Sequence, residues 1–183
     1  NGFFLSVEAG RIDHANHDGN LYRALTDGVA FADAVSRAVA LTSSQDTLII
    51  VTGDHSSALT FNGYCGRGSP ITGLCYKINK TGVKHLEKPA RAKDGKPYTV
   101  AGYLNGKSSV LKKDENYSGS RPVVTEQQAS DPDYLQQALV PLSAETHSGA
   151  DVAVYARGPW AHLLDGTIEQ NFIFHVMKYA AEA

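Results

Sequence analysis

The clearest periodic pattern in the chain is helical and covers residues 20–42. Apolar side chains recur there at intervals of three and four residues, with charged side chains between them. The apolar row consists of Leu25, Val29, Ala32, Val35 and Val39. A similar row near the end of the chain predicts a terminal helix over residues 167–181; it consists of Ile168, Phe172, Val176 and Tyr179.

Short apolar runs predict strands around the long helix. Residues 3–7 form one such run, which Gly10 ends, and residues 47–52 form a β-branched run typical of a strand buried on both faces of a parallel sheet. Residues 151–156 alternate and predict a third core strand. With residues 20–42 as the crossover helix of a βαβ unit, the order of elements predicts an α/β fold.

The middle of the chain differs in composition from both ends. Gly, Pro, Ser and Lys become frequent from about residue 58 to residue 143, and no long helical period survives. We expect an inserted, loop-rich subdomain, in which residues 98–104 are the best candidate strand and residues 134–140 form a short helix or strand. The predicted organisation is therefore a core segment over residues 1–57, an insertion over 58–143, and a core segment over 144–183.

Carboxylates and imidazoles follow two of the predicted strands. Glu8, Asp13 and His17 come after the first apolar run, and Asp54 and His55 come directly after the second. Ligands of α/β proteins bind at the carboxyl ends of strands. Asp13 and His17 are four positions apart and can converge on one cation if the backbone turns; zinc accepts both oxygen and imidazole nitrogen. The alternative is a set of solvated or hydrogen-bonded loop residues without a metal.

The charge balance excludes one class of partner. The 183 residues contain 17 basic and 19 acidic side chains, so no basic surface for nucleic acid is predicted. No apolar run approaches the ~20 residues that a membrane-spanning helix needs. The composition therefore predicts a globular domain whose partner is a small molecule or a protein.

Both the start of the chain and its cysteines bear on where the protein works. The sequence begins at Asn1 with no signal segment, which suggests a piece of a longer chain. Cys65 and Cys75 are the only cysteines and lie ten positions apart. They could form a small disulfide loop in an oxidising compartment, or they could be two free thiols.

Three separated blocks of the sequence together resemble the alkaline phosphatase family. The blocks are FFLSVEAGRIDHANH at residues 3–17, LIIVTGDHSS at residues 48–57 and ETHSGADVAVYARGP at residues 145–159. Their order and spacing resemble the C-terminal half of that family, with the N-terminal half absent. The resemblance implies part of a parallel-sheet sandwich core, with a crown-like subdomain of small β elements as the insertion.

The resemblance also implies a set of metal ligands. The family uses two zinc ions and one magnesium ion beside a serine nucleophile. Asp13, His17 and His147 match the ligands of the first zinc, Asp54 and His55 match ligands of the second, and Glu8 matches a magnesium ligand.

The family's nucleophilic serine belongs to the absent half, so the resemblance assigns no catalytic nucleophile to this chain. Ser56 and Ser57 are expected to have ordinary turn roles. The implied reaction of the parent enzyme is hydrolysis of phosphate monoesters through a phosphoserine intermediate, with release of inorganic phosphate, and the fragment alone is expected to be inactive. The resemblance further implies a homodimer in a periplasmic, extracellular or surface-anchored location.

Two other functions compete with this hypothesis. One is a different metal-dependent phosphoester or sulfoester hydrolase of the same superfamily. The other is a non-catalytic metal-binding module.

Overall fold

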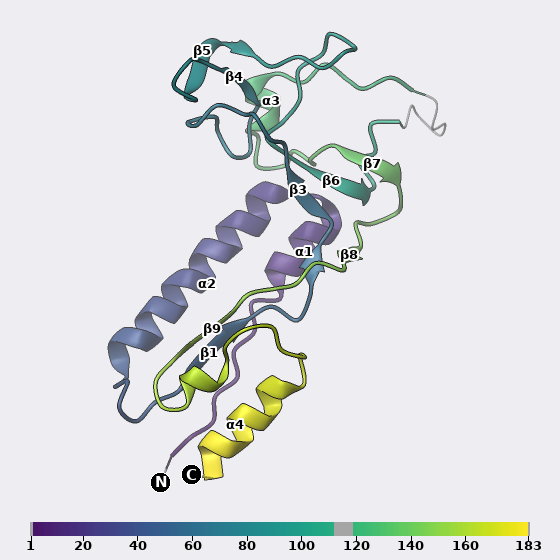
Figure 1. The fold of residues 1–183 in the computed structure, drawn as a ribbon. Coiled ribbons are helices and arrows are strands. Elements are labelled where there is room, and N and C mark those ends of the chain that lie inside the picture. The colour runs from purple at the N-terminus through teal and green to yellow at the C-terminus, as the bar shows by residue number, and fades with distance from the viewer. Residues whose placement is uncertain (1, 112–118, 183) are drawn as a thin grey trace. The chain divides into compact units, whose positions relative to one another are not determined.

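The computed structural model describes residues 2–111 and 119–182, and Figure 1 shows their fold. The chain forms two compact units, each built from two separate stretches of sequence. Unit 1 comprises Asn1–Val29 and Ser57–Thr146, and unit 2 comprises Ala30–Ser56 and His147–Ala183. The chain therefore changes unit after Val29, after Ser56 and after Thr146.

The first two helices are α1 (Arg11–Asp18) and α2 (Leu21–Leu41). Gly19 separates them with a left-handed φ of 74°, and its backbone N–H closes the last turn of α1. Asn20 then accepts a hydrogen bond from the backbone N–H of Arg23, as a helix N-cap does. The helix predicted over residues 20–42 is confirmed, whereas α1 lies in a segment for which no helix was predicted.

Unit 1 contains a three-stranded mixed sheet. Its strands are β3 (Leu59–Phe61), β6 (Ala101–Gly106) and β7 (Ala138–Pro141), with β6 in the centre. β3 pairs with β6 antiparallel and β7 pairs with β6 parallel. Ala101, Tyr103 and Asn105 of β6 are all buried, as the alternation of a central strand requires. The strand predicted near residues 98–104 is therefore present, and the ambiguous segment 134–140 leads into a strand.

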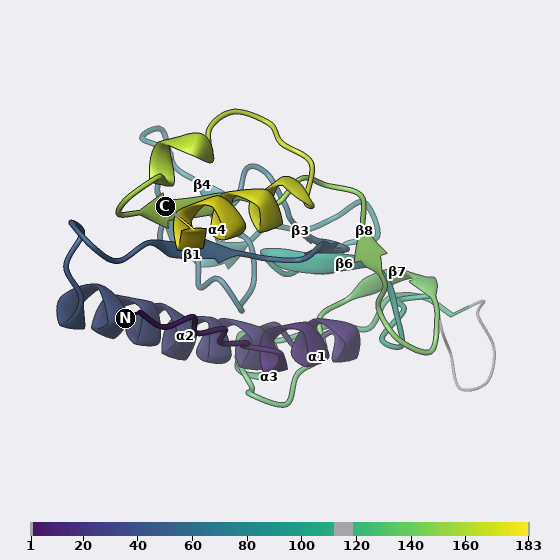
Figure 2. The same cartoon turned by 90° about the horizontal axis from the view of Figure 1, so that it is seen from below.

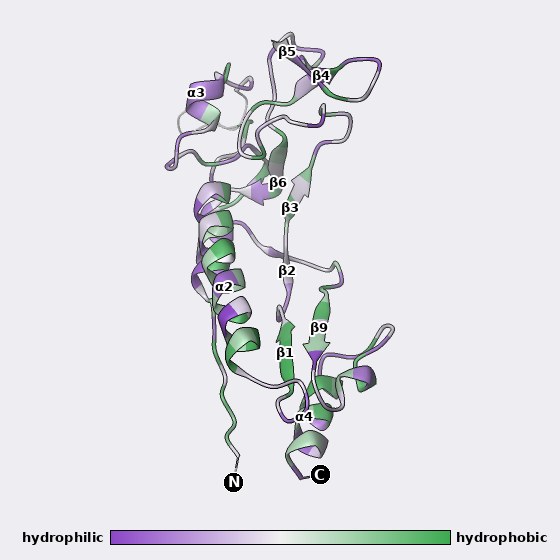
Figure 3. Ribbon diagram, turned by 90° about the vertical axis from the view of Figure 1, so that its left-hand side faces the viewer, coloured by the Kyte–Doolittle hydropathy of each residue, from purple (hydrophilic) through white to green (hydrophobic). Residues whose placement is uncertain are grey.

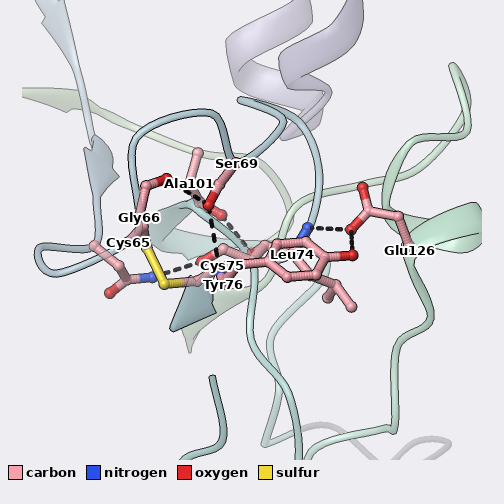
Figure 4. Close-up of a disulfide and its surroundings, with 10 residues drawn as sticks. Cys65, Gly66, Ser69, Leu74, Cys75, Tyr76, Ala101 and Glu126 are labelled. Carbon is pink, nitrogen blue, oxygen red and sulfur yellow. Dashed lines mark hydrogen bonds between the residues drawn. A yellow bond between two sulfur atoms is a disulfide. The ribbon is translucent and has the colours of Figure 1, made fainter. Parts of the chain in front are cut away.

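A disulfide closes the loop between β3 and a hairpin of unit 1. The hairpin consists of β4 (Tyr76–Ile78) and β5 (Lys84–Pro89), which pair antiparallel. Cys65 and Cys75 are bonded, so the disulfide alternative is the one that the structure shows (Figure 4). Cys75 is fully buried and packs with Ala90 and Val100.

The short helix α3 (Glu126–Ala129) is joined to this loop through one carboxylate. Thr125 and Gln128 form a capping box at the start of α3. Glu126 Oε2 accepts hydrogen bonds from the backbone N–H of Leu74 and from the hydroxyl of Tyr76, each at 3.1 Å (Figure 4). A single side chain thus fixes α3 to the segment that carries the disulfide.

Unit 2 is built on the strand pair β1 (Ile49–Thr52) and β9 (Val154–Arg157). Both strands are coloured mainly as hydrophobic in Figure 3, and the helix α4 (Phe172–Glu182) lies beside them in Figures 1 and 2. The 3-10 helix η1 (Ala161–Leu163) follows β9 after a turn at Gly158. Gly158 has a φ of 111°, and a Cβ there would lie 2.0 Å from the carbonyl oxygen of Thr47, so this turn requires glycine.

Two sequence-based expectations about the core sheet are corrected. β1 and β9 pair antiparallel, with Ile50 opposite Ala156, and β1 is half-buried rather than covered on both faces. A β-branched run indicates burial but contains no information about strand direction, which explains the error. Residues 3–7 form no strand, because no described segment pairs with them; Phe3, Phe4, Leu5 and Val7 are 65–80% exposed.

Two further strands are β2 (Ser56–Ser57) and β8 (His147–Ser148), each only two residues long. Within unit 2, the hydroxyl of Ser56 lies 2.6 Å from the hydroxyl of Ser148 and donates to the carbonyl of Ser148 at 3.0 Å. Over the described residues, none of the helices has the length and apolar composition that crossing a membrane would require.

Candidate metal centre

Helix α1 presents a carboxylate and an imidazole on one face. Asp13 and His17 are four residues apart, a spacing that places two side chains one above the other on a helix. His17 Nε2 lies 3.3 Å from Asp13 Oδ2, and each side chain is 34% exposed. The helical backbone, which the sequence patterns did not predict, thus supplies the turn that brings these two ligand types together.

The orientation of the His17 ring is set by Glu145. His17 Nδ1 lies 2.7 Å from the backbone carbonyl oxygen of Glu145. A carbonyl oxygen only accepts, so Nδ1 must be the ring nitrogen that donates. In the neutral ring Nε2 then has the lone pair, and this is the nitrogen that faces Asp13.

Helix α1 is also held in place by a buried hydrogen bond at Asn16, the residue before His17. The hydroxyl of Tyr103 on β6 donates a hydrogen bond to Asn16 Oδ1 at 2.8 Å, and both residues are buried. Burial, and then the nearby charge of Glu145, raises the pKa of Tyr103 above its ordinary value, so the hydroxyl stays protonated and able to donate.

The segment that leads to His147 is tied into unit 1. Thr146 donates its backbone N–H to Asn105 Oδ1 at 2.9 Å, and Asn105 Nδ2 lies 2.9 Å from the hydroxyl of Thr146. The carbonyl of Thr146 accepts the backbone N–H of Ala58 at 3.2 Å. His147 is the next residue of the chain, so these hydrogen bonds hold the residue that directly precedes it.

The second strand end holds Asp54 and His55 in unit 2. They follow β1 after Gly53, as predicted, and His55 Nε2 lies 3.6 Å from Asp54 Oδ2. His55 Nδ1 lies 3.2 Å from the carbonyl oxygen of Ser56, which can only accept, so Nε2 again has the lone pair in the neutral ring. The rings of His55 and His147 are stacked, with centroids 3.3 Å apart and planes 15° apart. Unit 2 therefore brings together two imidazoles that the resemblance assigned to different zinc ions.

Glu8 precedes α1 and is exposed. Its carboxylate lies close to Gly10, where an added Cβ would be 3.1 Å from Glu8 Oε1. Within the described residues, Glu8 belongs to no group of three side chains that could hold a metal ion.

Comparison with known proteins decides the family. The alkaline phosphatase family model matches residues 1–183, which is the whole chain. The chain belongs to the alkaline phosphatase family.

Relatives in this family are 44–46% identical to the chain over nearly all of its length. An alkaline phosphatase of Gadus morhua is 45% identical over 181 residues, which are 99% of this chain and 34% of that protein. Tissue-nonspecific alkaline phosphatase isozymes of Felis catus and Homo sapiens are 46% and 44% identical over 180 residues. These residues are 98% of this chain and 31% of each isozyme. The chain thus spans about a third of the length of the curated alkaline phosphatases it matches.

One residue of this alkaline phosphatase segment was given no role by sequence reasoning. Glu145 is the first residue of the third block that resembles the family, yet a lone Glu before a strand has no feature that distinguishes it from a solvated side chain. Its side chain is in fact fully buried beside His17. Only the fold, which places residue 145 against α1, could have identified it.

Proposed function

We propose that the complete gene product that carries this chain hydrolyses phosphate monoesters and releases inorganic phosphate. The family membership of all 183 residues and the names of the relatives support this proposal. The observation that carries it is the pair on α1, in which a carboxylate oxygen and an imidazole nitrogen of Asp13 and His17 lie 3.3 Å apart. Two adjacent atoms that can both bind a metal ion suit a metal-assisted reaction of a charged substrate.

The donor set fits zinc. Asp13 and His17 of unit 1 each offer one ligand atom, and carboxylate oxygen with imidazole nitrogen is a combination that zinc binds. The family resemblance adds His147 to this pair. We assign these three residues to one zinc ion, Asp54 and His55 to a second, and Glu8 to magnesium. When bound, the metal ions supply positive charge that offsets the negative charge of the phosphate oxygens.

This chain's own part in the reaction is to hold and orient those ligands. His17 donates from Nδ1 to the carbonyl of Glu145, which leaves Nε2 beside Asp13. His55 is held in the same sense by the carbonyl of Ser56. Ordering the ring nitrogens in advance lowers the entropic cost of assembling a metal site.

The proposal takes the nucleophile from outside these residues. Ser56 adjoins His55, but its hydroxyl is bonded to Ser148, which is a structural role. The family resemblance places the nucleophilic serine in the part of alkaline phosphatases that this chain does not match. The chain alone should therefore lack phosphatase activity.

The disulfide supports a location outside the cytoplasm. Disulfides persist in secreted, periplasmic and surface proteins, and Cys65 is bonded to Cys75. We propose a periplasmic, extracellular or surface-anchored enzyme that acts as a homodimer, as the family resemblance implies.

A comparison of hydrolysis rates tests the proposed function. The complete gene product should hydrolyse an aryl phosphate, lose that activity on treatment with a chelator and regain it with zinc. The chain of 183 residues alone should show no turnover under the same conditions. Failure of the complete protein to hydrolyse the ester would contradict the proposed reaction, and zinc-dependent turnover by the chain alone would contradict the external nucleophile.

A further inference from the structure

Glu145 is a buried carboxylate for which the proposed reaction has no use. Its side chain has no exposed surface. Beside it lies the side chain of His17, which can carry a positive charge and whose Nδ1 is 3.6 Å from Glu145 Oε2. Burying a carboxylate costs several kcal/mol unless hydrogen bonds compensate. The contacts of Glu145 with neighbouring segments explain why a carboxylate is buried at this position.

Glu145 contacts helix α1 through its backbone. Its N–H donates to the carbonyl oxygen of His17 at 2.9 Å, and its own carbonyl oxygen accepts from His17 Nδ1 at 2.7 Å. His17 is therefore held by residue 145 at both its main chain and its ring.

The carboxylate of Glu145 reaches a second segment. Oε1 accepts a hydrogen bond from the buried backbone N–H of Ala58, which comes three residues after His55. Glu145 itself comes two residues before His147. One side chain in unit 1 thus joins the stretch that follows one proposed ligand to the stretch that precedes another, and lies against the ring of a third.

We propose that Glu145 is a positioning residue for His17 as a zinc ligand. Its carbonyl holds His17 with the hydrogen on Nδ1, and its carboxylate holds Ala58 and lies beside the same ring nitrogen. Nε2 of His17 is thereby kept as the ligand atom that faces Asp13. This role rests on the proposed function, because it assumes that these residues bind zinc.

The substitution Glu145→Gln separates positioning from packing. Glutamine has nearly the same shape, but only one of its two terminal atoms accepts a hydrogen bond. In either orientation of the amide, its NH2 group faces one of two hydrogen-bond donors, the N–H of Ala58 or Nδ1–H of His17. The position of the His17 ring should therefore be disturbed without the loss of a large side chain.

Glu126→Gln is the matched control. Glu126 also lies in unit 1 and uses Oε2 to accept from the backbone N–H of Leu74 and the hydroxyl of Tyr76. The same change from acid to amide is made there, away from the proposed ligands.

The experiment measures zinc affinity in the complete gene product by competition with a chelator. The relevant zinc is the one that His17→Ala removes. For Glu145→Gln we expect the dissociation constant of this zinc to rise about 10- to 100-fold, the usual effect of losing a partner of a metal ligand. Glu126→Gln should leave it unchanged. Circular dichroism of the metal-free variants should match that of the native protein.

The outcomes distinguish the two proposals. Native protein that binds no zinc would overturn the proposed function and the positioning role with it. Native zinc binding with an unchanged dissociation constant in Glu145→Gln would overturn the positioning role alone.

A second measurement needs no variant at residue 145 and so does not depend on whether Glu145→Gln folds. Nitrogen-15 NMR of the histidine rings in the native zinc-bound protein should show hydrogen on Nδ1 of His17 and zinc on Nε2. Hydrogen on Nε2 would overturn the role of Glu145.

Discussion

The side chains of Asp13 and His17 lie next to each other because both are on one face of helix α1. Their four-residue separation has meaning only because residues 11–18 are helical, which puts Nε2 and Oδ2 3.3 Å apart. In an extended segment, the same residues would lie more than ~10 Å apart along the chain. The local backbone therefore decides the chemistry here.

Asp13→Ala should abolish zinc uptake at the first proposed site. The substitution removes a carboxylate ligand and leaves His17 without the oxygen beside Nε2. Elemental analysis of the complete gene product should show less zinc than in the native protein. Asp18→Ala is the control, because Asp18 lies on the same helix but pairs with Lys107 at 2.7 Å. Equal zinc content in native protein and Asp13→Ala would count against the assignment.

At the residue scale, the sequence allowed ligands to be proposed but did not predict how their side chains are held. The types and spacing of Asp13, His17, Asp54 and His55 were enough to nominate them. Glu145 could not be nominated, because its importance comes from burial against α1, and burial of a polar side chain leaves no periodic signal in the sequence.

At the scale of elements, a disulfide between Cys65 and Cys75 closes one loop of unit 1. Cys65 and Cys75 are ten positions apart, and the loop between them contains three glycines and one proline. Replacing both cysteines with serine should lower the free energy of unfolding by about 2–4 kcal/mol, since the unfolded chain regains freedom. Urea denaturation of the native protein and the variant measures this difference. Equal midpoints would show that the hairpin β4–β5 is stable without the bond.

The segment between β5 and β6 is tied to the segment before α3 by an ion pair. Arg121 donates from Nε and Nη2 to the two carboxylate oxygens of Asp94, at 2.8 and 2.7 Å. This hydrogen bonding, with that from the backbone of Lys96, lowers the pKa of Asp94 to about 2.

The titration of Asp94 gives a prediction with a definite sign. The pKa of Asp94 in the folded state lies below its ordinary value of 3.8, so the contribution to stability is present above about pH 4 and is lost as pH falls through about 2. Carbon-13 NMR of the Asp94 carboxyl group should show a midpoint near 2, and Arg121→Ala should raise it. A midpoint near 4 in the native protein would rule out the ion pair.

The long periodic elements were the ones that could be predicted from the sequence. α2 follows from its apolar row, and α4 from a row that includes the buried Val176, although α4 begins later than residue 167. α1 was missed because its residues are mostly polar and show no apolar periodicity. The direction of the β1–β9 pair was wrong because pairing is set by tertiary contacts between segments about a hundred residues apart.

At the scale of the whole molecule, the chain corresponds to one part of the alkaline phosphatases it matches. It matches about a third of each relative, and the proposed ligands lie between Glu8 and His147 of the matched segment. Several large apolar side chains are exposed in this segment, among them Phe3, Phe4 and Tyr155. The proposed activity accordingly belongs to the complete gene product.

The central claim is that Asp13, His17 and His147 bind one zinc ion. Anomalous X-ray diffraction from crystals of the complete gene product, recorded above and below the zinc absorption edge, tests it most directly. The account predicts an anomalous peak that appears only above the edge and is bonded to Asp13, to His147 and to Nε2 of His17. A zinc-replete crystal with no peak at these three side chains would contradict it.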